Sequence, residues 1–180
     1  MANNEFLFWG ISKLLKSYKS KELSPVEVVK TSLKHASKCN EKYNFVTEYL
    51  EENAIKNAII SENSFMGKGH QPRLIEGITL AIKDEFALEG TFRTSGSAIF
   101  KNRKDQYTDV YISRLINGGC IPLLKTTTPE FCLLGTTWSD LHGITSNPWN
   151  EKYTPGGSSG GSGVSLATGS SVIATGTDIG

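Results

Sequence analysis

A tract of glycine and serine near the C-terminal end holds the residues best suited to catalysis or binding: positions 155–163, Pro-Gly-Gly-Ser-Ser-Gly-Gly-Ser-Gly. Three interpretations compete. Backbone N–H groups ahead of a helix could cradle a phosphate, but the tract lacks the GxxxxGK(S/T) spacing. A flexible loop is the plain alternative, although Pro155 and the apolar residues after the tract speak against it. Third, glycines permit backbone geometry that side chains forbid, so a tight turn could present a serine hydroxyl. The third interpretation needs a base nearby.

Histidine is the usual base for a serine nucleophile. The chain has three, His35, His70 and His142, and they lie on the polar side of a helix, in a glycine-rich turn and in a loop. We expect each of them to be exposed to solvent or hydrogen-bonded locally. No cluster of His, Cys and carboxylate residues has the spacing of a zinc site. A lysine base is therefore the alternative.

Lys83 is the candidate for that base. It ends an apolar run at 77–83 that is typical of a buried strand, in which the larger apolar residues share one face. The lysine shares the other face with Thr79 and Ala81, which are small enough to let it point inward. An amine removed from water is more easily neutral and can then accept a proton. The competing interpretation is that Lys83 reaches into solvent, as most lysines at strand ends do.

Helices are predicted for residues 1–65. Ser24-Pro25-Val26-Glu27 combines an N-cap serine, a proline at the first helical position and a glutamate able to close a capping box. Apolar residues follow at helical spacing, so one face of this helix should pack on the rest of the chain. A second helix is expected at 47–60, before the turn Gly67-Lys68-Gly69.

From about Gly77 onward the pattern changes to short apolar runs separated by helices, which is typical of a buried parallel sheet. The elements expected there, in chain order, are a strand at 77–83, a helix from 108 or 109 to 118, a strand at 120–124, a short helix from 128, a helix at 160–168 and a strand at 172–175. The fold class is α/β: N-terminal helices followed by part of a mixed, largely parallel central sheet with flanking helices.

Composition limits the classes of partner. The 180 residues include 19 Lys plus Arg and 18 Asp plus Glu, so the net charge is +1. A charge this small does not indicate binding to nucleic acid or to an anionic membrane. The three cysteines, Cys39, Cys120 and Cys132, have no CxxC spacing, which favours a reducing compartment. No stretch approaches the ~20 apolar residues of a membrane span. We expect a cytoplasmic protein with no nucleic-acid or membrane partner.

Several segments resemble the amidase signature family in order and spacing over roughly residues 22–180. The serine-glycine tract is the defining motif of that family, and it is highly specific when an Ile-Lys-Asp strand stands upstream, as it does here. The segments that carry the resemblance are 77–84 (GITLAIKD), 90–97 (GTFRTSGS), 125–131 (KTTTPEF), 147–150 (NPWN), 156–162 (GGSSGGS) and 176–180 (GTDIG).

The resemblance implies a catalytic relay. Lys83 matches the family's lysine base, and Ser158 matches its bridging serine, whose preceding peptide bond, here after Gly157, is cis in that family. Neutral Lys83 would take the proton of Ser158, and Ser158 that of a nucleophilic serine, which attacks an amide carbonyl to give an acyl-enzyme. The relay supplies both base and nucleophile, so no metal or organic cofactor is expected.

Other residues are implied as supports of this relay. Ser159 and Ser162, beside the bridging serine, are expected to hold the tract by hydrogen bonds. Asp178 is expected to hold the final loop by hydrogen bonds, and a structural salt bridge is the alternative for it. Backbone N–H groups of that loop, mainly near its end, would meet the charge on the carbonyl oxygen; its residues are Thr177, Asp178, Ile179 and Gly180.

The family's nucleophilic serine would fall at position 182, and the sequence ends at Gly180. The resemblance therefore predicts the N-terminal portion of a single domain, with helices at 1–65 packed on the first part of an α/β core at 66–180. Such a portion would be inactive alone. As a full-length protein it would act on a small-molecule amide, and a homo-oligomer is compatible with it.

Two alternatives remain open. The chain could be a truncated, amidase-like binding protein without turnover. It could also be the part of an amidotransferase that acts on misacylated tRNA. That protein typically has Met-Asp where Thr128-Pro129 stands, which makes the general amidases the closer likeness.

Overall fold

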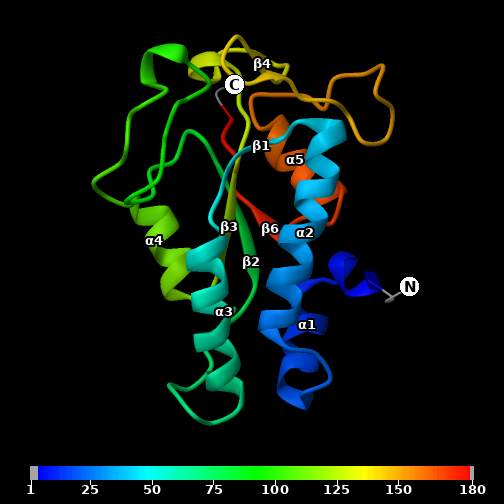
Figure 1. Cartoon of the computed structure of the whole chain (residues 1–180), viewed down its shortest axis with the longest axis vertical. Helices are drawn as coiled ribbons and strands as arrows, with labels where there is room; N and C mark the ends of the chain where they lie inside the picture. Colours follow the sequence, from blue (N-terminus) through cyan, green and yellow to red (C-terminus); the bar gives the residue numbers. More distant parts are fainter. Residues whose placement is uncertain (1–3, 179–180) are drawn as a thin grey trace.

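Four strands form the sheet at the centre of residues 4–178, which are the residues that the computed structural model describes (Figure 1). In spatial order they are β1 (Val46–Tyr49), β3 (Ile121–Thr126), β2 (Thr79–Lys83) and β6 (Ile173–Ala174). β2 pairs in parallel with β3 and with β6, whereas β1 pairs antiparallel with β3. The sheet is mixed and largely parallel, as the sequence predicts.

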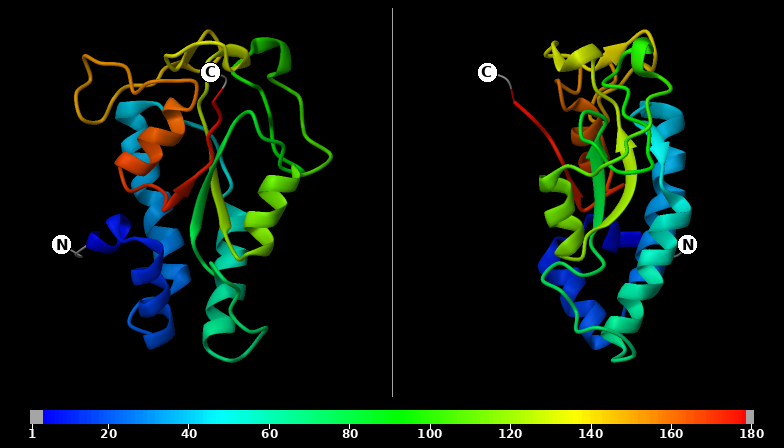
Figure 2. Two further views of the ribbon diagram at one scale, coloured as in Figure 1. Left: turned by 180° about the vertical axis from the view of Figure 1, so that it is seen from behind. Right: turned by 90° about the vertical axis from the view of Figure 1, so that its left-hand side faces the viewer.

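Helices cover both faces of this sheet (Figure 2). They are α1 (Ile11–Ser20), α2 (Pro25–Tyr43), α3 (Glu51–Phe65), α4 (Val110–Asn117) and α5 (Gly160–Ala167), with short 3-10 turns η1 (Asn4–Phe8), η2 (Ala98–Phe100) and η3 (Glu130–Cys132). α2, α3 and α5 lie against one face, and α1 and α4 against the other. A small hairpin of β4 (Trp138–Ser139) and β5 (Gly143–Ile144) stands apart from the main sheet.

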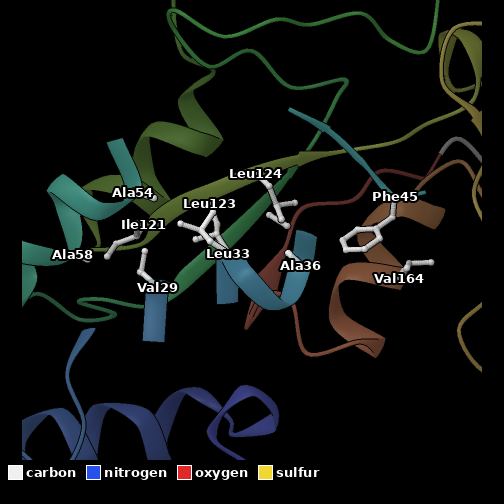
Figure 3. Close-up of a cluster of buried hydrophobic side chains, with 11 residues drawn as sticks. Val29, Leu33, Ala36, Phe45, Ala54, Ala58, Ile121, Leu123, Leu124 and Val164 are labelled. Carbon is white, nitrogen blue, oxygen red and sulfur yellow. The ribbon is translucent and has the colours of Figure 1, made fainter. Parts of the chain in front are cut away.

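Two apolar clusters join these layers. The first lies between α2, α3, α5 and the sheet, with Leu33 and Leu123 among its members (Figure 3). The second fills the opposite face, under α1 and α4. Neighbouring residues of β2 face different clusters: Leu80 belongs to the second and Ala81 to the first. Because strand side chains alternate with a period of two, Lys83 shares the face of Ala81, as the sequence predicts.

The start of α2 follows the sequence signal. The Oγ of Ser24 accepts hydrogen bonds from the backbone N–H groups of Val26 and Glu27, at 3.0 and 3.4 Å, and Pro25 takes the first helical position. The Ser24 hydroxyl also donates to the carboxylate of Glu62 in α3. Ser24 therefore caps the N-terminus of α2 and also links α2 to α3.

The helix expected at 47–60 is wrong in its first part. Residues 46–49 form β1, and α3 begins only at Glu51. The Oδ1 of Asn40 accepts the N–H groups of Phe45 and Val46, at 2.7 and 2.8 Å, and turns the chain out of α2. Pairing with β3 then overrides the local helical pattern, because strand formation depends on the partner available.

The other expected elements are present with ends shifted by a few residues: β2, α4, β3, η3, α5 and β6. Asp109 takes the N-cap position of α4, but its Oδ2 accepts the N–H of Ala87 at 2.8 Å instead of one within the helix. Of the helices in residues 4–178, none is both long and apolar enough to cross a membrane.

Candidate active site

Lys83 meets two hydroxyl groups at the C-terminal end of β2. Its Nζ lies 2.7 Å from the Oγ of Ser158 and 2.5 Å from the Oγ1 of Thr177. The lysine is fully buried, so the interpretation that it reaches into solvent is wrong. Its backbone N–H donates to the Oγ1 of Thr175 at 2.8 Å. The structure thus brings together three residues that the sequence proposes for one site: Lys83, Ser158 and Thr177.

The serine-glycine tract is held by hydrogen bonds on both sides of Ser158. The peptide bond between Gly157 and Ser158 is cis, as the resemblance implies. The hydroxyl of Thr128 donates to the carbonyl of Ser158 at 3.0 Å, and that of Thr137 donates to the carbonyl of Gly156 at 2.8 Å. These contacts favour the interpretation in which a fixed turn presents a serine hydroxyl, and a flexible loop does not fit them.

The tract packs too closely on its neighbours for larger residues. A Cβ placed on Gly157 would lie 2.7 Å from the backbone nitrogen of Thr136, and one on Gly161 would lie 2.6 Å from the backbone nitrogen of Thr127. Real Cβ atoms are essentially never this close to backbone atoms. The glycines at these two positions therefore allow the tract to lie directly against the segment that follows β3.

The two neighbouring serines both form hydrogen bonds to other segments of the chain. The Oγ of Ser159 accepts the N–H of Thr177 at 3.1 Å and donates to its carbonyl at 3.3 Å. The Oγ of Ser162 lies 2.8 Å from the Oγ1 of Thr126 in β3. Ser159 thus ties the tract to the final loop, and Ser162 ties α5 to the sheet.

The final loop is described only in part. Thr177 is half-buried at the site, and Asp178 is exposed next to it. Ile179 and Gly180, which the resemblance proposes as donors to the carbonyl oxygen, lie outside the described residues. Their role and that of Asp178 stay predictions.

Glu85 is a site residue that the sequence analysis did not identify. Its Oε2 lies 3.2 Å from the Nζ of Lys83 and accepts a hydrogen bond from the Oγ1 of Thr177 at 2.7 Å. Burial raises the pKa of this carboxyl, but the hydrogen bonds from Thr177 and Lys83 outweigh burial and hold it below its ordinary value. The sequence pattern did not mark it, because Glu85 lies in the turn that follows β2 and not in the strand itself.

A second polar cluster lies behind the site and was also missed. Asp84 and Lys125 are both buried, and the Nζ of Lys125 lies 3.7 Å from the Oδ1 of Asp84. Thr94 donates its N–H and its hydroxyl to the same carboxylate. Burial raises the pKa of Asp84 and lowers that of Lys125, and each is partly offset by the charge of the other.

Two of the histidines depart from expectation. The Nε2 of His142 lies 2.9 Å from the Oγ1 of Thr94, and burial lowers the pKa of this imidazole. The Nε2 of His35 lies 2.7 Å from the carbonyl of Thr168, at the end of α5. Both therefore make long-range contacts. His70 is exposed and contacts the neighbouring carbonyl of Gln71, as predicted.

The curated proteins to which this sequence is similar carry the names of enzymes that transfer or hydrolyse amides. A glutamyl-tRNA(Gln) amidotransferase chain from Marinomonas sp. (strain MWYL1) is 35% identical over 172 residues, which cover 95% of this chain and 35% of that protein. Indoleacetamide hydrolase of Bradyrhizobium diazoefficiens is 33% identical over 172 residues, covering 96% and 33%. This chain spans about a third of the length of the curated relatives it matches.

A solved structure of an amide hydrolase is also similar to this chain. A fatty acid amide hydrolase superposes with a TM-score of 0.92 at 25% identity, over 99% of this chain and 32% of that chain. The family model for Amidase matches residues 27–180. This agreement confirms the resemblance: the chain belongs to the amidase signature family.

Proposed function

We propose that this chain supplies the proton relay of an amide hydrolase, an amidase that cleaves the C–N bond of a small-molecule carboxylic amide through an acyl-enzyme. The observation that carries the proposal is the 2.7 Å contact between the Nζ of Lys83 and the Oγ of Ser158. A buried amine at hydrogen-bond distance from a fixed serine hydroxyl is the arrangement that a lysine–serine relay needs.

In the proposed mechanism Lys83 is the base. Its neutral amine takes the hydroxyl proton of Ser158, and the Oγ of Ser158 takes the proton of a nucleophilic serine, whose oxygen attacks the amide carbonyl carbon. The departing nitrogen receives a proton back along the same path, which leaves the acyl-enzyme. A water molecule then gives its proton to the relay, attacks the acyl group and releases the carboxylic acid.

Neighbouring residues position the relay. The hydroxyl of Thr177 fixes the direction of the Lys83 amine, and that of Thr128 fixes the carbonyl of Ser158. Ser159 holds Thr177 through its backbone. These three side chains are proposed as positioning residues: those of Thr177 and Thr128 contact the relay, that of Ser159 holds Thr177, and none of the three is part of the relay.

The nucleophile and most of the acyl pocket are proposed to lie outside residues 1–180. The resemblance places the nucleophile at position 182, and the relatives are about three times longer than this chain. We therefore expect the 180-residue chain alone to be inactive and to resist acylation by a serine-directed fluorophosphonate. Robust labelling of the chain by that probe would contradict this part of the proposal.

The direct test is hydrolysis of a panel of carboxylic amides by the protein expressed from the complete open reading frame that encodes these residues. Lys83→Ala should lower turnover by about 10²-fold or more. Lys56→Ala, on the exposed side of α3, is the matched control and should keep full activity. Turnover retained in Lys83→Ala would overturn the assignment. No turnover in the unaltered protein would favour an amidase-like binding protein.

A second candidate is a component of a tRNA-dependent amidotransferase, because several of the relatives carry that name. The relay of Lys83 and Ser158 would serve an amidotransferase as well. The two are separated by offering the expressed protein glutamyl-tRNA(Gln), with glutamine as amide donor and ATP to activate the glutamyl carboxylate, alongside the amide panel. Formation of glutaminyl-tRNA would favour the amidotransferase, and hydrolysis of simple amides alone would favour the hydrolase.

A further inference from the structure

A cleft of about 380 Å³ opens between α2, β1 and the start of α3, and none of the residues of the candidate active site lines it. Its apolar lining comes from Leu33, Tyr49 and Ile55. Tyr49 is 38% exposed, and Ile59, one helical turn after Ile55, is 47% exposed. Residues 4–178 therefore leave an apolar strip of this surface open to solvent.

The two helices that border the cleft, α2 and α3, lie side by side and run antiparallel (Figure 1). Ser24, at the N-cap of α2, contacts Glu62 near the end of α3. Lys30 lies near the start of α2, and Glu51 is the first residue of α3. Both residues line the cleft and both are exposed, so a positive charge and a negative charge stand toward its opposite ends.

These charges are not neutralised by neighbouring side chains. Lys30 and Glu51 form no ion pair with any of the described residues, and neither does Lys34, which lines the cleft one helical turn further along α2. Elsewhere on the surface an exposed pair does form, between Lys42 and Glu151 at 2.7 Å. An apolar cleft with an unpaired cation at one end and an unpaired anion at the other is complementary to a second copy of itself after a two-fold rotation.

We propose that this cleft is the contact surface for a second copy of the same chain, related to the first by a two-fold axis through the middle of the cleft. The axis exchanges the two ends, so Lys30 of each copy meets Glu51 of the other and two ion pairs form. Between those pairs the apolar strips of the two copies cover each other, which removes Tyr49 and Ile59 from water. This inference concerns assembly and does not depend on the proposed function.

A different protein fits the charges of this surface less well. An acidic segment would pair with Lys30 and Lys34 but would meet Glu51 with a like charge, and a basic segment would pair with Glu51 but meet the lysines with a like charge. A second copy offers each of these ends its opposite. Because charge pairs across an interface act mainly on specificity and orientation, they should determine which face the two copies use.

Charge reversal tests the inference, with sedimentation equilibrium of the protein from the complete open reading frame as the measurement. The unaltered protein should form a dimer. Lys30→Glu and Glu51→Lys each place two like-charge pairs in the contact, so each should raise the dissociation constant of the dimer by about 10-fold or more. Both positions are exposed, so circular dichroism should show an unchanged fold. Lys101→Glu, at an exposed position outside α2 and α3, makes the same change in net charge as Lys30→Glu and should leave the dissociation constant unchanged.

A mixture of the two single variants provides a second readout. In a mixed dimer of Lys30→Glu with Glu51→Lys both contacts again join opposite charges, so the mixture should dimerise at a concentration where neither variant does so alone. The double variant Lys30→Glu/Glu51→Lys should recover the dimer for the same reason. Added salt should weaken the mixed dimer and strengthen the self-association of each single variant, because it screens attraction and repulsion alike.

Two results would overturn the inference. A monomer at every concentration would show that a second copy does not cover this surface, which would leave it to a different partner. A dimer that neither Lys30→Glu nor Glu51→Lys weakens would show that another face holds the copies together. Amide hydrolysis enters neither result, so a failure of the proposed function would leave this test unaffected.

Discussion

The amine of Lys83 lies 2.7 Å from the hydroxyl of Ser158, although 75 positions separate the two residues in the chain. Lys83 ends a buried strand in the middle of the sheet, and Ser158 precedes α5, which packs on that sheet. Both side chains are therefore placed by rigid elements, which is what a catalytic contact requires.

Close packing of the serine-glycine tract gives a test with a built-in control. Gly161→Ala should lower the free energy of unfolding by about 1–3 kcal/mol, because its Cβ would overlap the backbone of Thr127. Gly163→Ala lies in the same helix with nothing within 4 Å of its Cβ. Gly163→Ala should raise the free energy of unfolding by about 0.5–1 kcal/mol, because alanine has a higher helix propensity than glycine. Urea unfolding of both variants measures the contrast, and equal effects would contradict the packing described.

The buried pair behind the site predicts a strong dependence between two mutations. Lys125→Met should destabilise the fold by about 3 kcal/mol or more, because Asp84 is left as a buried charge without its ion pair. Asp84→Asn combined with Lys125→Met should recover part of that loss. A double-mutant cycle by chemical denaturation measures the coupling, and additive effects of the two substitutions would show that the pair does not interact.

A carboxylate away from the site predicts how stability responds to acid. Glu76 is buried and accepts hydrogen bonds from Arg73, at 2.6 Å to the Nε, and from Ser61. Burial raises the pKa of this carboxyl, but those hydrogen bonds outweigh burial and bring it below its ordinary 4.5. A lowered pKa contributes stability above the unfolded value, and that stability is lost as pH falls through the folded value.

Glu76→Gln should therefore be less stable than the unaltered chain at pH 7, and the difference should shrink as the pH falls below about 4. Urea unfolding at pH 7 and pH 3.5 gives both differences. The control is Glu41→Gln, at an exposed position of α2, which should leave the free energy of unfolding unchanged at both pH values. A difference that stays constant with pH would contradict the contribution of the Glu76 carboxylate.

The N-cap of α2 offers a smaller effect. Ser24→Ala removes the oxygen that accepts the N–H groups of Val26 and Glu27, so it should cost about 1 kcal/mol of unfolding free energy. Ser12→Ala, at an exposed position within α1, is the control and should not lower stability. The midpoints of thermal unfolding compare them, and equal midpoints would contradict the capping role.

Local signals accounted for those parts of the fold that depend on neighbouring residues. The start of α2 followed from Ser24-Pro25, whereas the small neighbours Thr79 and Ala81 made the burial of Lys83 one of two open interpretations. β1 was missed because the hydrogen bonds that make it a strand come from β3, more than seventy residues later. A helical pattern within one segment carries no information about such a partner.

The residues of the candidate site also divide into those that the sequence located and those that it did not. The resemblance located Lys83 and Ser158 because both lie in recognisable motifs. Asp84 and Lys125 lie in two of those motifs, yet their pairing depends on the register between β2 and β3, which the sequence does not state. Glu85 was missed because it lies in the turn after β2, where strand alternation does not apply, and its contact with Thr177 joins segments 92 positions apart.

The measurement that tests the central claim most directly is a double-mutant cycle on Lys83 and Ser158, using the protein from the complete open reading frame and an amide that it hydrolyses. Because the two residues act as one relay, Lys83→Ala and Ser158→Ala should each reduce kcat by about 10²–10⁴-fold, and the double variant should lose no more than the worse single variant. Losses that multiply in the double variant would show that Lys83 and Ser158 act independently and would contradict the relay.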